Sequence, residues 1–311
     1  MRWTIVALLV LLLPCGSSAQ QMIKVNMVEL YDKVPPPPVD AKEAFARCEK
    51  VGEDNPTNCS PEKFYQPIVG KAQELTKQLE ETSMKLVEPD KGSLTKANAE
   101  EIQKKMETMS QEEKVKYAME LSNQMGLGQR KVVVEPPSVT AFMQEYSKVS
   151  LETGKDMQKI GEESRKDQQM GEDRWNKHKD IDEWTRKEMD KIPEISTGEM
   201  SYREPKAEHA LLLKSAEKHI ALENEYLKWR RKQFQTELDK DKKRYISLQQ
   251  KVAATGYGEE AKNLETKRMV ISAQGILLGP VEGLTGMSRD ATKEAADWYA
   301  KKLELEKQKP Q

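Results

Sequence analysis

The sequence has little of what a large compact core requires. Aromatic residues account for only 6% of the 311 residues, and the mean hydropathy is −0.81. These values exclude a large globular core. Apolar residues nevertheless recur at regular spacing, which argues against disorder throughout the chain. Long, thin helical packing reconciles the two observations.

The chain also lacks a charge imbalance. Charged residues make up 33% of it, both signs are interleaved, and the formal net charge is −1. A nucleic-acid-binding surface concentrates lysine and arginine on one face, so we expect no nucleic-acid partner. The interleaved charges are typical of a solvated helical surface.

Motifs that carry chemistry are scarce as well. His209 and His219 lie ten positions apart, so on a helix they would point about 80° apart and could not share a metal ion. His219 and Glu223, at a spacing of four, could form half of a zinc site. There is no Ser-His-Asp pattern and no phosphate-binding glycine motif. The sequence therefore predicts no catalytic residue, no metal site and no cofactor.

The first 19 residues have the parts of a signal peptide. Arg2 is the positive residue, Thr4 to Leu13 form an apolar segment, and Ala19 precedes a cleavage point before Gln20. The apolar segment is shorter than the roughly 20 residues that a membrane-spanning helix needs. A retained anchor and lipid modification of Cys15 are the alternatives, although the proline before that cysteine does not fit a lipoprotein signal. We therefore expect an exported protein, periplasmic or extracellular, with a cleaved leader.

Removal of this leader leaves two cysteines, Cys48 and Cys59. The residues between them are rich in turn formers such as Gly52 and Pro56. In an oxidising compartment the simplest interpretation is one disulfide bond that closes this short loop. Such a bond would stabilise the fold by roughly 3 kcal/mol.

The chain is organised around the stretch from Glu204 to Gly256, which has no glycine or proline between Pro205 and its end. Its apolar residues recur at steps of three, four and seven, the seam of a long helix that needs a partner along one side. A second stripe with steps of three and four runs from Ser138 to Ile192, weakened by three glycines. Consecutive helices of matching length, joined by a loop from Pro193 to Pro205, are expected to pair antiparallel.

The seam of the second arm is interrupted by polar residues. The interruptions fall at Glu223 to Asn224, at Arg230 to Arg231 and at Asp241. A self-sufficient coiled coil needs unbroken apolar seam positions, so these interruptions favour a hairpin leg over a free zipper.

We therefore predict an all-α, elongated protein with a long antiparallel, coiled-coil-like helical hairpin and smaller helical regions at both ends. The predicted segments are a signal peptide (1–19), an extended proline-rich lead-in (20–40), a disulfide-stapled helical region (41–130), the hairpin (138–256) and a C-terminal helical unit (257–311).

The C-terminal unit is expected to contain a glycine-rich segment from Gly275 to Gly286 between two helices. A tight turn is the simpler interpretation, and a loop that contacts a partner or a membrane is the alternative. That alternative depends on the apolar residues Ile276, Leu277, Leu278, Val281 and Leu284.

Function is predicted only as a class. We expect an exported, non-catalytic scaffold or adaptor of the cell envelope that binds a protein partner, or a second copy, through its helical arms. Contact with a membrane is compatible with this, but an anchor is not expected. A chaperone-like holdase is one alternative, although its arms would usually be basic. A cell-wall-acting enzyme is another, and it would require a cleft with a converged acid–base pair.

Overall fold

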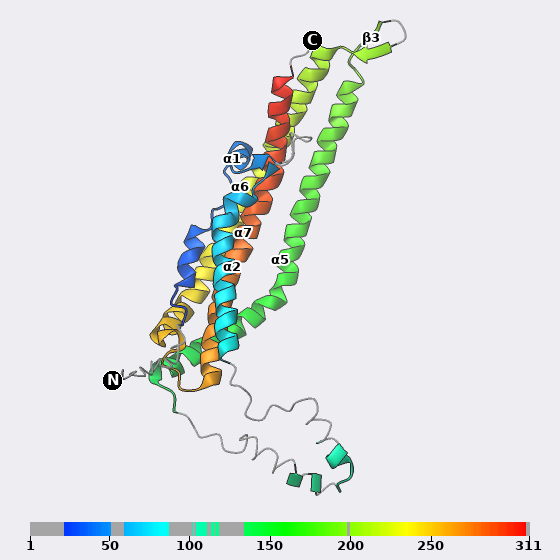
Figure 1. The fold of residues 1–311 in the computed structure, drawn as a ribbon. Helices are drawn as coiled ribbons and strands as arrows, with labels where there is room; N and C mark the ends of the chain where they lie inside the picture. Colours follow the sequence, from blue (N-terminus) through cyan, green and yellow to red (C-terminus); the bar gives the residue numbers. More distant parts are fainter. Residues whose placement is uncertain are drawn as a thin grey trace, which may run out of the picture.

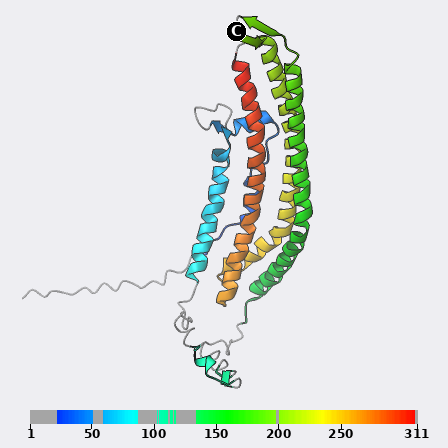
Figure 2. The same ribbon diagram turned by 90° about the vertical axis from the view of Figure 1, so that its right-hand side faces the viewer.

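Three long helices run up, down and up along one axis and define an all-α fold (Figure 1). They are α5 (Pro137–Met189), α6 (Pro205–Ala254) and α7 (Leu264–Lys307). A shorter helix, α2 (Glu62–Lys85), packs along α7 (Figure 2). This computed structural model describes residues 22–50, 59–86, 102, 104–110, 113–114, 116–117, 134–197 and 200–308. None of the described helices combines the length and apolar character that crossing a membrane requires.

Helices α5 and α6 form the predicted antiparallel hairpin. Each starts with a proline at its first helical position, where the missing N–H has no intrahelical partner to lose. The predicted loop between them contains two strands, β3 (Glu194–Thr197) and β4 (Met200–Arg203), which pair antiparallel. This small β-hairpin forms the tip of the molecule, where α5 ends and α6 begins (Figure 1).

The predicted turn in the glycine-rich segment is wrong. Helix α7, which is 44 residues long, continues through this segment. The C-terminal unit is therefore a third long helix and not a pair of short ones. Leu277, Val281 and Leu284 keep helical spacing and are buried. Each interior glycine costs a helix about 1 kcal/mol relative to alanine. Burial of a continuous apolar stripe outweighs that cost, which is why local glycine content misleads here.

The turn from α6 into α7 depends on one glycine. Gly258 ends the 3₁₀ turn η2 (Gly256–Gly258) with a φ of +98°, and its N–H donates to the Thr255 hydroxyl at 3.1 Å. A Cβ at this position would lie 2.9 Å from the Met22 methyl carbon. The flexible Met22 side chain could move away from a Cβ, so it is the backbone conformation that requires glycine here.

The segment before the first helix lies against α6 and α7. Its 3₁₀ helix η1 (Met27–Lys33) is held by two buried hydrogen bonds. Met27 N–H donates to Gln249 Oε1 at 2.9 Å, and the Tyr31 hydroxyl donates to the Leu277 carbonyl at 2.7 Å. The lead-in is thus part of the packed bundle, and α1 (Ala41–Ala46) follows it.

Candidate functional site

A groove of about 1080 Å³ lies between α5, α6 and α7, near the middle of all three helices. The α6 side runs from Trp229 to Asp241, and the α7 side runs from Pro280 to Met287. Helix α5 closes the groove with residues 166–173. Concave sites with an apolar floor and a few convergent polar groups are the usual places where ligands and partners bind.

One carboxyl group in this groove lies in an unfavourable electrostatic environment. The pKa of Asp241 is raised to about 6, because burial disfavours its charge and the nearby Glu237 carboxylate repels it. Lys240 opposes this shift but lies 3.4 Å from Glu237, with which it pairs. Asp167, by contrast, has a counter-ion in Arg230 at 3.3 Å. A perturbed carboxyl group in a cleft is a common mark of a functional position.

A buried ionic cluster beside the groove ties the three helices together. Glu223 is fully buried, and its Oε1 accepts hydrogen bonds from Arg174 Nε at 3.0 Å and Nη2 at 2.9 Å. The same oxygen lies 2.6 Å from His178 Nε2. Arg174 also forms an ion pair with Glu294 of α7. Arg174 also lines a cavity of about 250 Å³ that shares Met170, Asp173 and Trp229 with the groove, so the cluster lies next to the groove.

Two histidines extend this cluster through their ring nitrogens. His178 Nδ1 and His219 Nδ1 lie 2.6 Å apart, and His219 Nε2 lies 3.2 Å from Asp182 Oδ1. A hydrogen bond between two imidazole nitrogens needs one donor and one acceptor, so only one of the two Nδ1 atoms carries a hydrogen. Burial and the adjacent His178 lower the pKa of His219 to about 4, which agrees with a neutral ring. Trp298 of α7 stacks on it.

The cluster is arranged for helix association and not for metal binding. Hydrogen bonds use both ring nitrogens of His178, and a separation of 2.6 Å between two nitrogens is too short for two ligands of one zinc ion. Among the described residues, no three His, Cys, Asp or Glu side chains are placed to hold a metal. His209 is not part of the cluster and contacts the Leu305 carbonyl at 2.7 Å.

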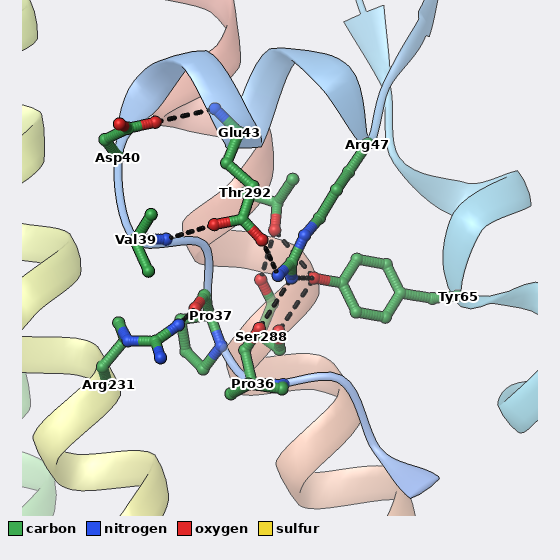
Figure 3. A network of polar contacts seen from close by, with 10 residues as sticks. All are labelled: Pro36, Pro37, Val39, Asp40, Glu43, Arg47, Tyr65, Arg231, Ser288 and Thr292. Carbon is green, nitrogen blue, oxygen red and sulfur yellow. Dashed lines mark hydrogen bonds and ion pairs between the residues drawn. The ribbon is translucent and has the colours of Figure 1, made fainter.

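A second polar network fixes the proline-rich lead-in (Figure 3). Arg47 Nη1 donates to the Pro36 carbonyl at 2.6 Å, and Arg231 of α6 donates to the Pro37 carbonyl. The Tyr65 hydroxyl lies within 2.8 Å of hydroxyl groups on α7. The network joins the lead-in, α1, α2, α6 and α7, which is a structural role.

The polar interruptions in the α6 seam coincide with these contacts. Glu223 is the centre of the ionic cluster, Asp241 lines the groove, and Arg231 holds the lead-in. Asn224 accepts a hydrogen bond from Ala41 N–H at 2.8 Å, at the start of α1. The interruptions were therefore the sequence signal for the site, but they did not reveal which helices supply the partners.

The tip of the molecule exposes two apolar side chains. Ile195 of β3 lies directly opposite Tyr202 of β4, and their exposed fractions are 39% and 45%. Directly opposed residues on paired strands point to the same face of the hairpin, so the two form a small apolar surface.

The two cysteines predicted to form a disulfide are both free thiols in the structure. The strands β1 (Glu49–Lys50) and β2 (Cys59–Ser60) pair antiparallel and bring the thiols of Cys48 and Cys59 together. The Cys59 thiol donates a hydrogen bond to Cys48, which lowers the pKa of Cys48 and raises that of Cys59. The structure places the two thiols in hydrogen-bonding contact and does not confirm the predicted disulfide bond.

The predicted partner-contact loop does not exist, because its residues belong to α7. Its apolar side chains face the core and not the solvent. Leu277, Leu278, Val281 and Leu284 are at most 3% exposed, and Ile276 is partly buried. The predicted cleavage point between Ala19 and Gln20 lies outside the described residues.

No protein-family model, curated protein or solved structure matches this chain. Its function is therefore inferred from its own residues.

Proposed function

We propose that the chain is an exported, non-catalytic protein of the cell envelope that acts as a scaffold or adaptor for another protein. The observation that carries this proposal is the groove between α5, α6 and α7, which is lined by both apolar and charged side chains. A concavity of this composition suits a protein partner.

The shape of the bundle supports the same function. At a rise of 1.5 Å per residue, α5 alone is about 80 Å long. Such a molecule presents contact surfaces far apart, with the groove at its middle and the apolar Ile195–Tyr202 pair at its tip. A scaffold needs separated surfaces, whereas a small globular domain of the same mass would not provide them.

Export and the disulfide bond form the second part of the proposal. The N-terminal pattern of Arg2, an apolar segment and small residues before Gln20 is that of a secretory signal. In an oxidising compartment the adjacent thiols of Cys48 and Cys59 would form a disulfide bond. Mass spectrometry after thiol alkylation without reductant is expected to leave both cysteines of the exported protein unmodified. Alkylation of both would contradict the proposed compartment.

Crosslinking in intact cells tests the interaction function. The full chain, with its own leader and a C-terminal tag, is expressed and crosslinked, and the cell fractions are analysed separately. We expect the mature protein in the envelope or exported fraction, joined to one or a few defined proteins. A chain that stays in the cytoplasm, or an exported chain that forms no specific crosslink, would refute the proposal.

A further inference from the structure

We propose that the groove binds a basic amphipathic helix of a partner protein, with the partner's lysine or arginine groups on Asp241 and Glu237 and its apolar side chains on the floor around Trp229. This inference rests on the interaction function proposed above. It adds the site and the chemistry of the partner.

The apolar residues that line the groove, called its floor below, come from all three helices. Met170 comes from α5, Trp229 from α6, and Leu284 and Met287 from α7. Gly283 also lines the groove, and a Cβ at this position would meet no other atom within 4 Å. The floor is therefore open at this glycine, so an apolar side chain of a partner could enter there. Methionine and aromatic side chains are common in surfaces that receive a helix.

The dimensions of the groove favour a helical partner. Its α6 wall extends from Trp229 to Asp241, thirteen residues that span about 18 Å at a rise of 1.5 Å per residue. This length equals about three turns of an α-helix, enough for anchors at positions i, i+3, i+4 and i+7. A small cation would occupy only a fraction of 1080 Å³.

The charges in the groove favour a basic partner. One lysine and four acidic residues line it: Lys166, Asp167, Asp173, Glu237 and Asp241. Asp167 and Glu237 have basic neighbours, whereas Asp241 forms no ion pair with any described residue. The raised pKa of Asp241 reflects burial beside Glu237, and Lys240 only partly offsets it. An ammonium or guanidinium group at this point would supply the lacking counter-charge.

The same charges disfavour other occupants. Carboxylates repel phosphate groups, so a nucleic acid or an anionic lipid surface would be excluded from this groove. A second copy of this chain would have to present a basic helix, yet its helices carry interleaved charges of both signs. A lysine-rich amphipathic helix of a different protein fits best.

A pair of synthetic peptides provides the probe. The first is an 18-residue peptide with leucines at i, i+3, i+4 and i+7 and lysines on the flanking positions. The second replaces every lysine with glutamate. Binding of each fluorescently labelled peptide to the full-length mature protein is measured by anisotropy at fixed ionic strength. We expect saturable binding of the lysine peptide and at least tenfold weaker binding of the glutamate peptide. Equal binding, or no binding of the lysine peptide, would overturn the inference.

Three variants localise the binding. The double variant Asp241→Asn/Glu237→Gln removes the charges of the groove, and Gly283→Leu fills its floor. Each is expected to weaken binding of the lysine peptide at least tenfold. Asp239→Asn removes the same charge from an exposed position of the same helix and is expected to change binding less than twofold. If Asp239→Asn weakened peptide binding as much as the double variant does, the peptide would be attracted by overall charge, and the groove would not be its binding site.

Failure of this inference is distinguishable from failure of the proposed function. If the double variant loses the peptide but retains every crosslink in cells, the groove is not the site of the cellular partner and the scaffold function stands. If the wild type forms no crosslink in cells, the scaffold function itself is wrong. Circular dichroism of each variant confirms that the comparison is made between folded proteins.

Discussion

Replacement of Glu223 tests whether the buried ionic cluster holds α5 onto the rest of the bundle. Glu223→Gln keeps the shape of the side chain and removes its charge. Arg174 and His178 would then direct their donors at a neutral amide, although Arg174 keeps its ion pair with Glu294. Breaking a buried ion pair costs about 3–5 kcal/mol, and the retained partner places this variant at the lower end, about 3 kcal/mol. The melting temperature should fall by about 5 °C.

Urea denaturation followed by far-ultraviolet circular dichroism measures the free energy of unfolding, and amide hydrogen exchange shows where the loss occurs. Exchange is expected to accelerate in the part of α5 around Arg174 and His178. Glu183→Gln is the matched control, because Glu183 forms an ion pair with Lys187 at 2.9 Å on the exposed face of α5. That variant should leave the free energy of unfolding almost unchanged, because an exposed ion pair contributes little to stability. If Glu223→Gln is no more destabilising than the control, the buried ionic cluster does not hold α5 onto the bundle.

Three further variants test other parts of the structure. Gly283→Ala should stabilise the protein by about 1 kcal/mol in urea denaturation, because the residue lies inside a helix with open space around it. Gly258→Ala should destabilise the protein, because Gly258 has a φ of +98° and a Cβ there would contact the Met22 methyl carbon. A destabilising Gly283→Ala together with a stabilising Gly258→Ala would contradict a continuous α7. Asp241→Asn should stabilise the protein by about 1–2 kcal/mol at pH 7, because the raised pKa of about 6 means that ionisation of Asp241 opposes folding above that pH. The gain in stability should vanish below pH 4, where the carboxyl group is protonated in both the folded and the unfolded state. The same gain at all pH values would refute this explanation. The Asp241→Asn variant also isolates the effect of His219, because the carboxyl group with the opposite pH dependence is absent. Its free energy of unfolding should fall by up to about 3 kcal/mol between pH 6.5 and 4, because His219 binds a proton in the unfolded state but stays neutral when buried. A free energy that does not change with pH in this range would refute this explanation.

The all-α class and the paired arms could be predicted because they depend on periodicity. Apolar residues at steps of three and four define a buried face whatever the neighbours are, and Pro137 and Pro205 mark the helix starts. The glycine-rich segment misled for the opposite reason. Glycines at 275, 279, 283 and 286 reduce local helix propensity, but tertiary burial of Leu277 and Val281 decides the outcome.

The candidate site could be predicted only in part. Glu223 and Asp241 stood out as polar residues in an apolar seam, and His219 stood out as the neighbour of Glu223. Their meaning depends on the register of α5 against α6, which brings Arg174 and His178 to Glu223. Sequence spacing fixes positions along one helix but not the alignment of two helices. The groove depends on three helices at once and was missed.

A basic helix of another protein is proposed to bind in the groove between α5, α6 and α7. A photoreactive amino acid at Gln233, which lines the groove, tests this directly in cells, with the exposed position Asp239 as control. We expect a discrete crosslink from position 233 to a lysine- or arginine-rich helix. This crosslink should be absent from position 239 and lost in Asp241→Asn/Glu237→Gln. Crosslinks of equal yield from both positions, or a crosslink from position 233 to an acidic or uncharged segment, would contradict it.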